Sequence, residues 1–542
     1  MGLGPMAGRF TAAEVCAGVH GSFDPRFSWP EAIASPGAPA AKQLSVPVST
    51  DTRTLSDGEI FFAFSGGNFD AHDHLDEAAA KGASVLVISA PEKIPAELTA
   101  VFRGSVILVG DTLRAYQDLA AYYRNKIDPY VIAVTGSVGK TTLKDMIACL
   151  VKDKYRTAAT QGNYNNQIGV PKTILDMPED TEVLVLELGM GGPGEIVRLA
   201  EIARPDAAAI TNIGLSHREC FDSDEGVMLE KLAIASQMSE GDLLAIDREN
   251  HPPLTQRARA KSEVHGYRLL EVSAKRSCRD SDHGQDQDPA LRDADYSYGT
   301  VHIEADTAEA SFEIESGGND GNDKNGAVTA RFLVPVPGDY AAVQAALACA
   351  AVSRLGIGLT EAAAALRELA RTPHRLQLIQ KDGILVIDDT YNASPDSMHS
   401  GLMFLTSVPA LRRIAVLADM KELGPESESL HRALGREIGT GLSAGQINVL
   451  VCYGEKARAI AEGAAETSEA RGTKETKGQV LCLAGSRQIR IYENQEEMIA
   501  DLLAGMETGD VYLVKGSHSM HMEAVANALL GQDGQGGQET EV

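Results

Sequence analysis

Hydrophobic residues near the start of the chain come in short runs that alternate with stretches of helical composition. A short helix is predicted near Thr11 to Val19, followed by an irregular lead-in rich in Gly, Pro and Ser. Farther along, apolar runs predict strands at Ile60 to Phe64, Val85 to Ile88 and Val106 to Val109, and an Ala-rich helix is predicted at Leu75 to Lys81. This alternation is typical of a small α/β domain.

From Tyr130 onward the apolar runs become continuous instead of alternating with polar residues. The clearest examples are Val131 to Val134, Val183 to Leu186 and Ala207 to Ile210. Continuous runs suit parallel strands that are buried on both faces, with helices between them covering the sheet. They predict a central α/β domain.

A polar stretch rich in Asp and Gly interrupts this central domain from Arg279 to Gly326, and we expect it to be a mobile surface loop. Inside and beyond it, Val301 to Ile314 and Val328 to Val336 alternate apolar and polar positions. That alternation predicts an antiparallel hairpin with a flexible connection.

A third α/β series follows an Ala-rich helix pair at Ala341 to Ala370. A Glu-, Thr- and Lys-rich loop is predicted from Ala464 to Gly478, and the final residues, GQDGQGGQETEV, are predicted to be a disordered tail. The strands of this series are predicted at Ile384 to Ile387, Ile414 to Leu417, Val449 to Cys452 and Val511 to Val514.

Length, charge and cysteine content argue against several classes of protein. The 542 residues suffice for about three or four domains, and 49 basic against 76 acidic residues give a net charge of −27, which disfavours nonspecific nucleic-acid binding. The seven cysteines are scattered and form no C-x-x-C pair, so we expect reduced thiols in the cytoplasm and neither a disulfide framework nor a zinc knuckle. No leader segment or membrane-inserting run is evident in the sequence.

The strongest chemical signal is VIAVTGSVGKTT at residues 131–142, where a predicted strand leads through a glycine-bearing turn into a predicted helix. In a P-loop, backbone N–H groups at the start of the helix point at phosphate oxygens. Lys140 would supply a cation to the phosphates, and the Thr141 hydroxyl would coordinate Mg²⁺. Val134 stands where the strict motif has glycine, which indicates a T-G-x-x-G-K-T variant. The predicted phosphate-binding set is Gly136, Ser137, Val138, Gly139, Lys140, Thr141 and Thr142.

Four further segments place polar residues after predicted strands or turns. Glu187 ends a strand next to the P-loop, where a metal-binding carboxylate belongs. Asn165 and Asn166 lie in a glycine-bounded loop whose amides can orient a phosphate, although such loops are commonly simple turns. His217 follows ITNIG, and a lone histidine is usually structural. The DDTYNASPDS segment in the third series also fits a turn that caps the next helix.

In combination, these motifs resemble the Mur ligases of peptidoglycan synthesis, and among them the MurF type. The resemblance spans roughly Ser49 to Leu530. DDTYN-x-x-P-D-S is its most specific part, because sister ligases carry a D-Y-A-H-x-P-like motif there. The matching motifs, in the order that the family shows, are TGSVGKTT, GNYNNQIGVP, LELGMGGPGEI, ITNIGLSH, DDTYNASPDSM, LADMKELGPES with His431, and YLVKGS.

The resemblance implies an α/β, three-domain Mur ligase architecture. Residues 1–125 would form the lead-in and a UDP-sugar-binding α/β domain, 126–372 a central P-loop parallel-sheet ATPase domain with a flexible insertion near 279–326, and 373–542 a C-terminal Rossmann-like domain with the tail. The implied reaction is ATP-dependent, with Mg²⁺. It joins D-alanyl-D-alanine to UDP-MurNAc-tripeptide through an acyl phosphate and gives UDP-MurNAc-pentapeptide for peptidoglycan synthesis. We expect a cytoplasmic monomer.

The resemblance also assigns roles to residues. Lys140, Lys231 and His217 are the predicted catalytic residues, and Lys231 falls where the family has a carbamoylated lysine. The predicted metal-binding residues are Thr141, Glu187, His217 and Lys231. Besides the phosphate-binding set, the predicted nucleotide-binding residues are Asn165, Asn166, Tyr340, Arg375, Asp389 and Asn392.

Two departures from the family pattern keep alternatives open. Ala233 replaces the glutamate of the family's Lys-x-Glu pattern, and Tyr340, Ala341 and Gln344 stand where the family reads H-N-x-x-N. At this position we predict that Tyr340 stacks on adenine. One alternative function is a sister ligase that adds a single amino acid to a nucleotide-sugar or folate acceptor. The other is a non-catalytic nucleotide-binding scaffold, which the altered segment would suit.

Overall fold

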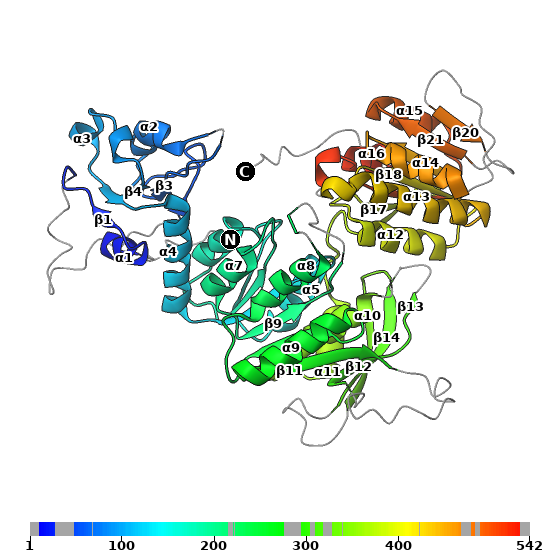
Figure 1. The fold of residues 1–542 in the computed structure, drawn as a ribbon, viewed down its shortest axis with the longest axis horizontal. Helices are drawn as coiled ribbons and strands as arrows, with labels where there is room; N and C mark the ends of the chain where they lie inside the picture. Colours follow the sequence, from blue (N-terminus) through cyan, green and yellow to red (C-terminus); the bar gives the residue numbers. More distant parts are fainter. Residues whose placement is uncertain are drawn as a thin grey trace.

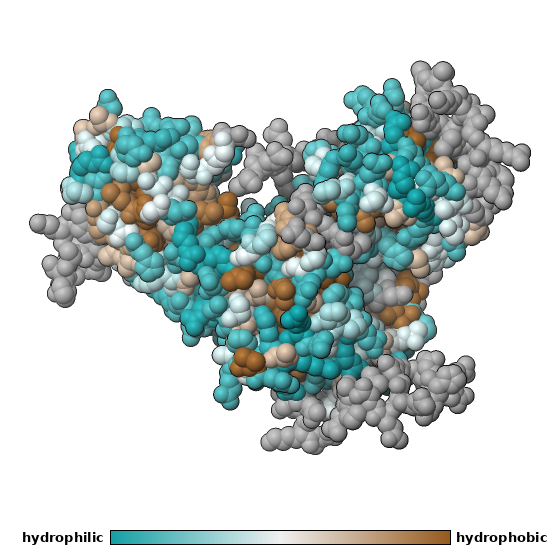
Figure 2. All heavy atoms as spheres, in the orientation of Figure 1, coloured by the Kyte–Doolittle hydropathy of each residue, from teal (hydrophilic) through white to brown (hydrophobic). Residues whose placement is uncertain are grey.

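The computed structural model contains three sheets in chain order, each with its own covering helices (Figure 1). Among the helices that the structure describes, none combines the length and apolar composition needed to cross a bilayer. The face shown in Figure 2 is largely hydrophilic, with hydrophobic residues in small areas. The structure describes residues 10–27, 48–67, 69–214, 220–221, 223–275, 294–303, 309–317, 328–338, 340–421, 423–467, 479–482 and 488–531.

The N-terminal sheet has five strands in the order β1-β5-β4-β3-β2, with β1 antiparallel to β5 and the others parallel. The strands and helices predicted for this part are confirmed. The Thr11 side chain caps α1, and α2 lies between β3 and β4. The strands are β1 (Ser22–Phe23), β2 (Val48–Ser49), β3 (Ile60–Phe62), β4 (Val85–Ile88) and β5 (Ser105–Leu108). The helices are α1 (Ala12–Gly18), α2 (Leu75–Ala80), α3 (Leu98–Val101) and α4 (Thr112–Ile127).

The central sheet has ten strands, and the P-loop strand β6 lies inside it between β8 and β9, parallel to both. Helices α4, α6, α7 and α8 contribute to the core on one face, and α5, α10 and α11 contribute to the core on the other. The strands are β6 (Tyr130–Thr135), β7 (Thr157–Ala159), β8 (Val183–Glu187), β9 (Ala207–Ile210), β10 (Leu243–Asp247), β11 (Arg268–Ala274), β12 (Tyr296–Tyr298), β13 (His302–Ile303), β14 (Ala310–Ser316) and β15 (Val328–Val334). The helices are α5 (Lys140–Val151), α6 (Gly169–Asp176), α7 (Glu195–Ala203), α8 (Asp224–Leu232), α9 (Pro252–His265), α10 (Tyr340–Ala351) and α11 (Leu359–Arg367).

The predicted hairpin near the insertion is partly confirmed and partly wrong. β14 and β15 pair antiparallel over seven residue pairs, as expected. However, Val301 to Ile314 is not one strand, because β13 pairs antiparallel with β14 with His302 opposite Ser311. β12 was not predicted, and it extends the parallel part of the sheet beyond β11. The rest of the expected loop, at 279–293 and 318–326, lies outside the described residues.

The C-terminal sheet has a parallel centre in the order β17-β22-β18-β19-β21, with antiparallel strands β16 and β20 at its two edges. The expected strands are confirmed, but the predicted loop at 464–478 is wrong at its start, because α14 continues to Thr467. The strands are β16 (Gln377–Lys381), β17 (Ile384–Asp389), β18 (Arg412–Ala418), β19 (Val449–Tyr453), β20 (Gln479–Cys482), β21 (Gln488–Tyr492) and β22 (Asp510–Lys515). The helices are α12 (Pro395–Ser407), α13 (Ser427–Ser443), α14 (Ala457–Thr467), α15 (Gln495–Ala504) and α16 (Glu523–Leu529). Of the predicted tail, residues 532–542 lie outside the described residues.

Helix α4 connects the first sheet to the second (Figure 1), and the buried Arg124 in its last turn joins it to α7. The guanidinium donates to the backbone carbonyls of Ala203, at 3.0 Å, and Arg204, at 2.9 Å, where α7 ends. Carbonyls at the end of a helix have no partner within the helix. Arg124 therefore satisfies them from a different element.

We predict that Arg124→Leu lowers the free energy of unfolding by about 2–3 kcal/mol, because it leaves the carbonyl of the buried Ala203 and that of Arg204 without this donor. Denaturant unfolding followed by circular dichroism would measure the change. Arg114→Leu is the matched control: Arg114 lies on the same helix, its side chain is 57% exposed, and its ion pair with Asp118 should be worth less than about 1 kcal/mol. Equal effects of the two substitutions would contradict the prediction.

Candidate active site

The turn between β6 and α5 has the backbone shape that a phosphate-binding loop needs. Gly136 and Gly139 have φ values of 148° and 83°, in the region that favours glycine. A Cβ atom on Gly136 would overlap the Thr211 hydroxyl, and one on Gly139 would overlap the side-chain amide of Gln344. Both the backbone conformation and the close neighbours therefore require glycine at these positions.

The turn is fastened to the end of β9. The backbone N–H groups of Ser137 and Val138 donate to the Asn212 side-chain oxygen at 3.2 and 2.9 Å. The Thr211 hydroxyl donates to the Val138 carbonyl at 2.6 Å, and the Gly214 N–H donates to the Ser137 hydroxyl at 2.7 Å. In this structure the N–H groups of Ser137 and Val138 therefore bind protein, and we expect the N–H groups at the start of α5 to face a phosphate.

The predicted metal-binding residues Thr141 and Glu187 are adjacent. The Thr141 hydroxyl donates to Glu187 Oε2 at 2.8 Å, and the Asn165 amide donates to Glu187 Oε1 at 2.8 Å. Glu187 is 2% exposed, and its backbone N–H bonds the Thr160 hydroxyl at 3.0 Å, which fixes the end of β8. Oxygen donors at one buried point form the kind of site that Mg²⁺ prefers.

The neighbouring polar residues have distinct surroundings. The Lys140 ammonium donates to the carbonyls of Gly136, at 2.9 Å, and Ser137, at 3.3 Å, so a positive charge lies against the turn. The side-chain oxygen of Asn166 accepts from the backbone N–H groups of Ile168, at 3.0 Å, and Gly169, at 2.8 Å. Asn166 therefore holds the start of α6, as expected for a turn, whereas Asn165 bonds Glu187.

Lys231 lies on α8 and is 1% exposed. Burial, reinforced by the charge of Lys140, lowers the pKa of Lys231 well below the ordinary value for lysine. The preceding Glu230 accepts hydrogen bonds from the backbone N–H groups of Gly194 and Ile196 at 2.9 and 2.8 Å, so it fixes the start of α7. The predicted metal-binding His217 lies outside the described residues.

The C-terminal domain contacts the P-loop helix directly. The Arg375 guanidinium donates to the Thr141 hydroxyl at 3.0 Å, and its central carbon lies 3.9 Å from the centre of the Tyr391 ring. Just before this domain begins, the Thr372 hydroxyl at the end of the central domain donates to Asp145 on α5 at 2.9 Å. The structure thus brings Arg375 to the predicted metal-binding threonine from a different domain.

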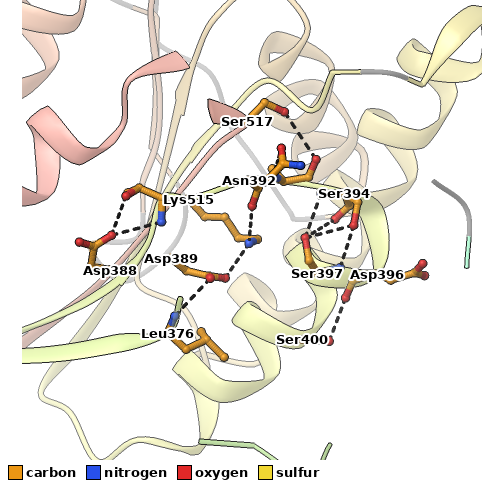
Figure 3. Close-up of polar contacts among 12 residues, drawn as sticks. Leu376, Asp388, Asp389, Asn392, Ser394, Asp396, Ser397, Ser400, Lys515 and Ser517 are labelled. Atoms are coloured by element: carbon orange, nitrogen blue, oxygen red, sulfur yellow. Dashed lines mark hydrogen bonds and ion pairs between the residues drawn. The ribbon is translucent and has the colours of Figure 1, made fainter. Parts of the chain in front are cut away.

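Asp389 and Asn392 lie in a hydrogen-bonded loop at the end of β17 (Figure 3). The buried Lys515 ammonium donates to Asp389 Oδ2 at 2.6 Å and to the Asn392 carbonyl at 2.9 Å. The backbone N–H of Leu376 donates to Asp389 Oδ1 at 3.2 Å. Burial raises the pKa of Asp389 and the Lys515 charge opposes that shift, so the carboxylate is held as part of a buried ion pair.

A pocket lies between α5, residues 335–337 with Tyr340 at the start of α10, residues 369–372, and residues 375–378 at the start of the C-terminal sheet. Thr142, Tyr340 and Arg375, all predicted nucleotide-binding residues, line this pocket. Gln344 lies one turn farther along α10, against Gly139, and its Oε1 has no hydrogen-bond partner among the described residues. Of the two polar replacements in the altered family segment, Tyr340 thus faces the pocket and Gln344 faces the P-loop.

Asn212, Thr372, Tyr391 and Lys515 were not predicted as site residues. Asn212 and Lys515 lie at the carboxyl ends of β9 and β22, and Tyr391 follows β17. Because open α/β sheets bind ligands at that edge, position alone would have selected these three. Thr372 lies between elements, and no pattern marks it.

Comparison with known proteins places these residues in a family. The Mur ligase middle domain matches residues 134–351, and the Mur ligase, glutamate ligase domain matches 374–518. The UDP-N-acetylmuramoyl-tripeptide–D-alanyl-D-alanine ligase of Bacillus subtilis (strain 168) is 34% identical over 487 residues, covering 89% of this chain and 93% of the relative. The chain belongs to this family of ligases.

Other relatives agree. The ligase with the same name in Escherichia coli (strain K12) is 31% identical, with 89% and 93% coverage. A crystal structure of MurF from Acinetobacter baumannii has a TM-score of 0.76 at 24% identity and covers 96% of this chain and 99% of its own. MurF from Thermotoga maritima in complex with ADP has a TM-score of 0.70 at 24% identity, with 90% and 98% coverage. The predicted family and the three-domain Mur ligase fold are confirmed.

In this MurF-family chain, His431 of the LADMKELGPES segment is fully buried and structural. Its Nε2 accepts the Met420 backbone N–H at 3.0 Å, and its Nδ1 lies 2.6 Å from the Ser427 carbonyl, to which it donates. These two bonds require the neutral ring. Burial lowers the pKa of His431 below the ordinary value of 6.5.

We predict that this histidine makes folding stability depend on pH. Its pKa is lower in the folded protein, so the unfolded chain binds more protons and stability falls as pH decreases below 6.5, by up to about 1.4 kcal/mol per pH unit. Denaturant unfolding from pH 8 to pH 5 would measure the slope. His431→Gln should lower the overall stability and flatten the slope, and an unchanged slope would show that other groups cause it.

Proposed function

We propose that this protein is an ATP-dependent ligase that joins D-alanyl-D-alanine to UDP-MurNAc-tripeptide and forms UDP-MurNAc-pentapeptide. The observation that carries the proposal is a P-loop with Thr141 bonded to the buried Glu187, in a chain that covers 93% of a ligase of this name at 34% identity. The ADP-bound Thermotoga maritima relative supports ATP as the nucleotide.

Each domain has a role in this proposal. Residues 1–125 bind the UDP-sugar, 126–372 bind ATP, and 373–542 help to hold ATP and the incoming amine. The contact between Arg375 and Thr141 supports the shared role of the last two domains, because it joins the C-terminal domain to the P-loop helix. Action as a monomer in the cytoplasm stays a prediction from the sequence.

The chemistry begins with a carboxylate, which is a poor acyl donor. One of its oxygens attacks the γ-phosphorus of ATP, and the bond from that phosphorus to the β-phosphate oxygen breaks. ADP departs, and the substrate is now an acyl phosphate. The Lys140 ammonium supplies positive charge at the turn where negative charge accumulates. The Thr141 hydroxyl and Glu187 carboxylate would hold Mg²⁺, which neutralises phosphate charge when bound.

The second step forms the amide bond. The free amine of D-alanyl-D-alanine attacks the acyl carbon, a proton leaves the nitrogen, and the tetrahedral intermediate expels inorganic phosphate. Most of the catalytic contribution is placement of the reacting groups in one site that excludes water. The pocket lined by Thr142, Tyr340 and Arg375 is our proposed site for the adenosine part of ATP, with Tyr340 stacking on the base.

Lys231 has a separate proposed role as a carbamoylated lysine. Burial lowers the pKa of Lys231 and so favours its neutral amine, the form that adds to CO₂. The carbamate that results carries oxygen atoms that can bind a metal ion, so a cationic side chain becomes an anionic ligand. The charge of Lys140 contributes to the lowered pKa of Lys231, and a negative carbamate at Lys231 would offset that positive charge.

We expect purified protein to release ADP and phosphate only when ATP, UDP-MurNAc-tripeptide and D-alanyl-D-alanine are all present, with the pentapeptide detected by mass spectrometry. Lys140→Ala should reduce the rate at least about 100-fold, because it removes the P-loop cation. Lys144→Ala, which removes a buried lysine one turn along α5, controls for loss of helix packing.

Turnover with only a single amino acid would instead favour a sister ligase. An active fold that binds ATP without turnover, and whose biological role survives Lys140→Ala, would favour the scaffold alternative.

For Lys231, we predict a carbamate carbon signal in ¹³C NMR spectra of protein equilibrated with ¹³C-bicarbonate. Lys231→Arg, which keeps a long basic side chain but cannot form the carbamate, should lack the signal and lower kcat about 10- to 100-fold. Lys152→Arg, at an exposed lysine after α5, should retain both signal and activity. A signal that persists in Lys231→Arg would contradict the assignment.

A further inference from the structure

We propose that Tyr391 is a positioning residue for the nucleotide site, because its ring fixes the plane of the Arg375 guanidinium against the P-loop. The inference rests on the proposed function in one respect: the ligand that Arg375 addresses is a phosphate group of ATP. Tyr391 itself acts through Arg375, with which it is in direct contact.

The geometry is that of a stacked cation. The central carbon of the Arg375 guanidinium lies 3.9 Å from the centre of the Tyr391 ring. Arginine stacks on aromatic faces because its guanidinium is planar and weakly hydrated, and the ring face carries negative potential. Contact at this distance therefore restricts the orientations that the guanidinium can take.

The fold brings the two side chains together from one hairpin. Arg375 precedes β16 and Tyr391 follows β17, and the two strands pair antiparallel with Gln377 opposite Asp388. Beyond the end of the ladder, the Tyr391 N–H donates to the His374 carbonyl at 3.1 Å. That bond fixes the spacing between the backbone segments that carry the cation and the ring.

The Arg375 guanidinium has one buried N–H group without an acceptor among the described residues. One terminal nitrogen bonds the Thr141 hydroxyl at 3.0 Å, whereas the buried Nε has no hydrogen-bond partner among the described residues. A buried N–H without an acceptor is costly and points to a missing ligand. Beside a P-loop threonine, the acceptor chemistry that fits an arginine donor is a phosphate oxygen.

No carboxylate in the described part of the chain forms an ion pair with Arg375. The nearby Asp389 is bonded to Lys515 and to the Leu376 N–H through its two oxygens. The charge of Arg375 acts on Asp389 only through space, whereas the Tyr391 ring is in direct contact with the guanidinium from the C-terminal domain. A residue with this role should matter through its ring and not through its hydroxyl.

The test is steady-state kinetics of the ligase reaction with ATP varied. Tyr391→Phe keeps the ring and should leave kcat/KM for ATP within about twofold of wild type, whereas Tyr391→Leu should lower it about 3- to 30-fold. The KM values for the two other substrates should not change. Tyr453→Leu, which removes a half-buried ring at the end of β19, controls for general loss of packing in this domain.

A double-mutant cycle separates positioning from a structural effect. In the Arg375→Ala background, Tyr391→Leu should change kcat/KM less than about twofold, because the group that it positions is gone. The same factor in both backgrounds would overturn the proposal. So would a Tyr391→Phe variant as impaired as Tyr391→Leu.

Nucleotide binding tests the inference separately from the ligase reaction. Calorimetric titration with Mg²⁺ and a non-hydrolysable ATP analogue should show weaker binding to Tyr391→Leu than to Tyr391→Phe, with the same cycle against Arg375→Ala. If wild-type protein binds the analogue but does not catalyse ligation, the proposed function fails. The titration would still test whether Tyr391 positions Arg375. Equal affinities for the two Tyr391 variants would overturn the positioning role.

Discussion

The active site depends on how the P-loop turn is tied to the carboxyl end of β9. A turn at the end of a buried strand exposes backbone N–H and carbonyl groups that must find partners. Asn212 and Thr211 supply them, and this close approach leaves room for only glycine at Gly136. With the turn fixed, the first residues of α5 have one position, so Thr141 meets Glu187 on β8.

The sequence predicted those parts of the fold that are marked by local pattern. β6, β8 and β9 are continuous apolar runs because both faces of the central sheet are covered by helices. The P-loop glycines could be recognised in the sequence because the turn requires glycine at these positions. For Thr141 and Glu187, order along the chain together with the expected sheet topology predicted that they lie together.

The rest of the fold and of the site depends on contacts between distant segments, and such contacts leave no periodic pattern in the sequence. Lys515 and Asp389 are 126 positions apart, and nothing in either segment alone indicates a buried ion pair. β12 and β13 have only three and two residues, too few for an alternating pattern. Asn165 and Asn166 show that neighbouring amides of one loop can differ, because Asn166 holds a helix start, as a turn would, whereas Asn165 reaches Glu187.

The β16–β17 hairpin has a consequence for motion between domains. Arg375 and Tyr391 belong to one rigid piece of backbone, but Thr141 belongs to another domain. If the C-terminal domain rotated away from the central sheet, the guanidinium and the ring that orients it would leave the P-loop together and return together. The arginine would then need no reordering on each closure, and the entropy of arranging it would be lost once, on folding, instead of in every catalytic cycle.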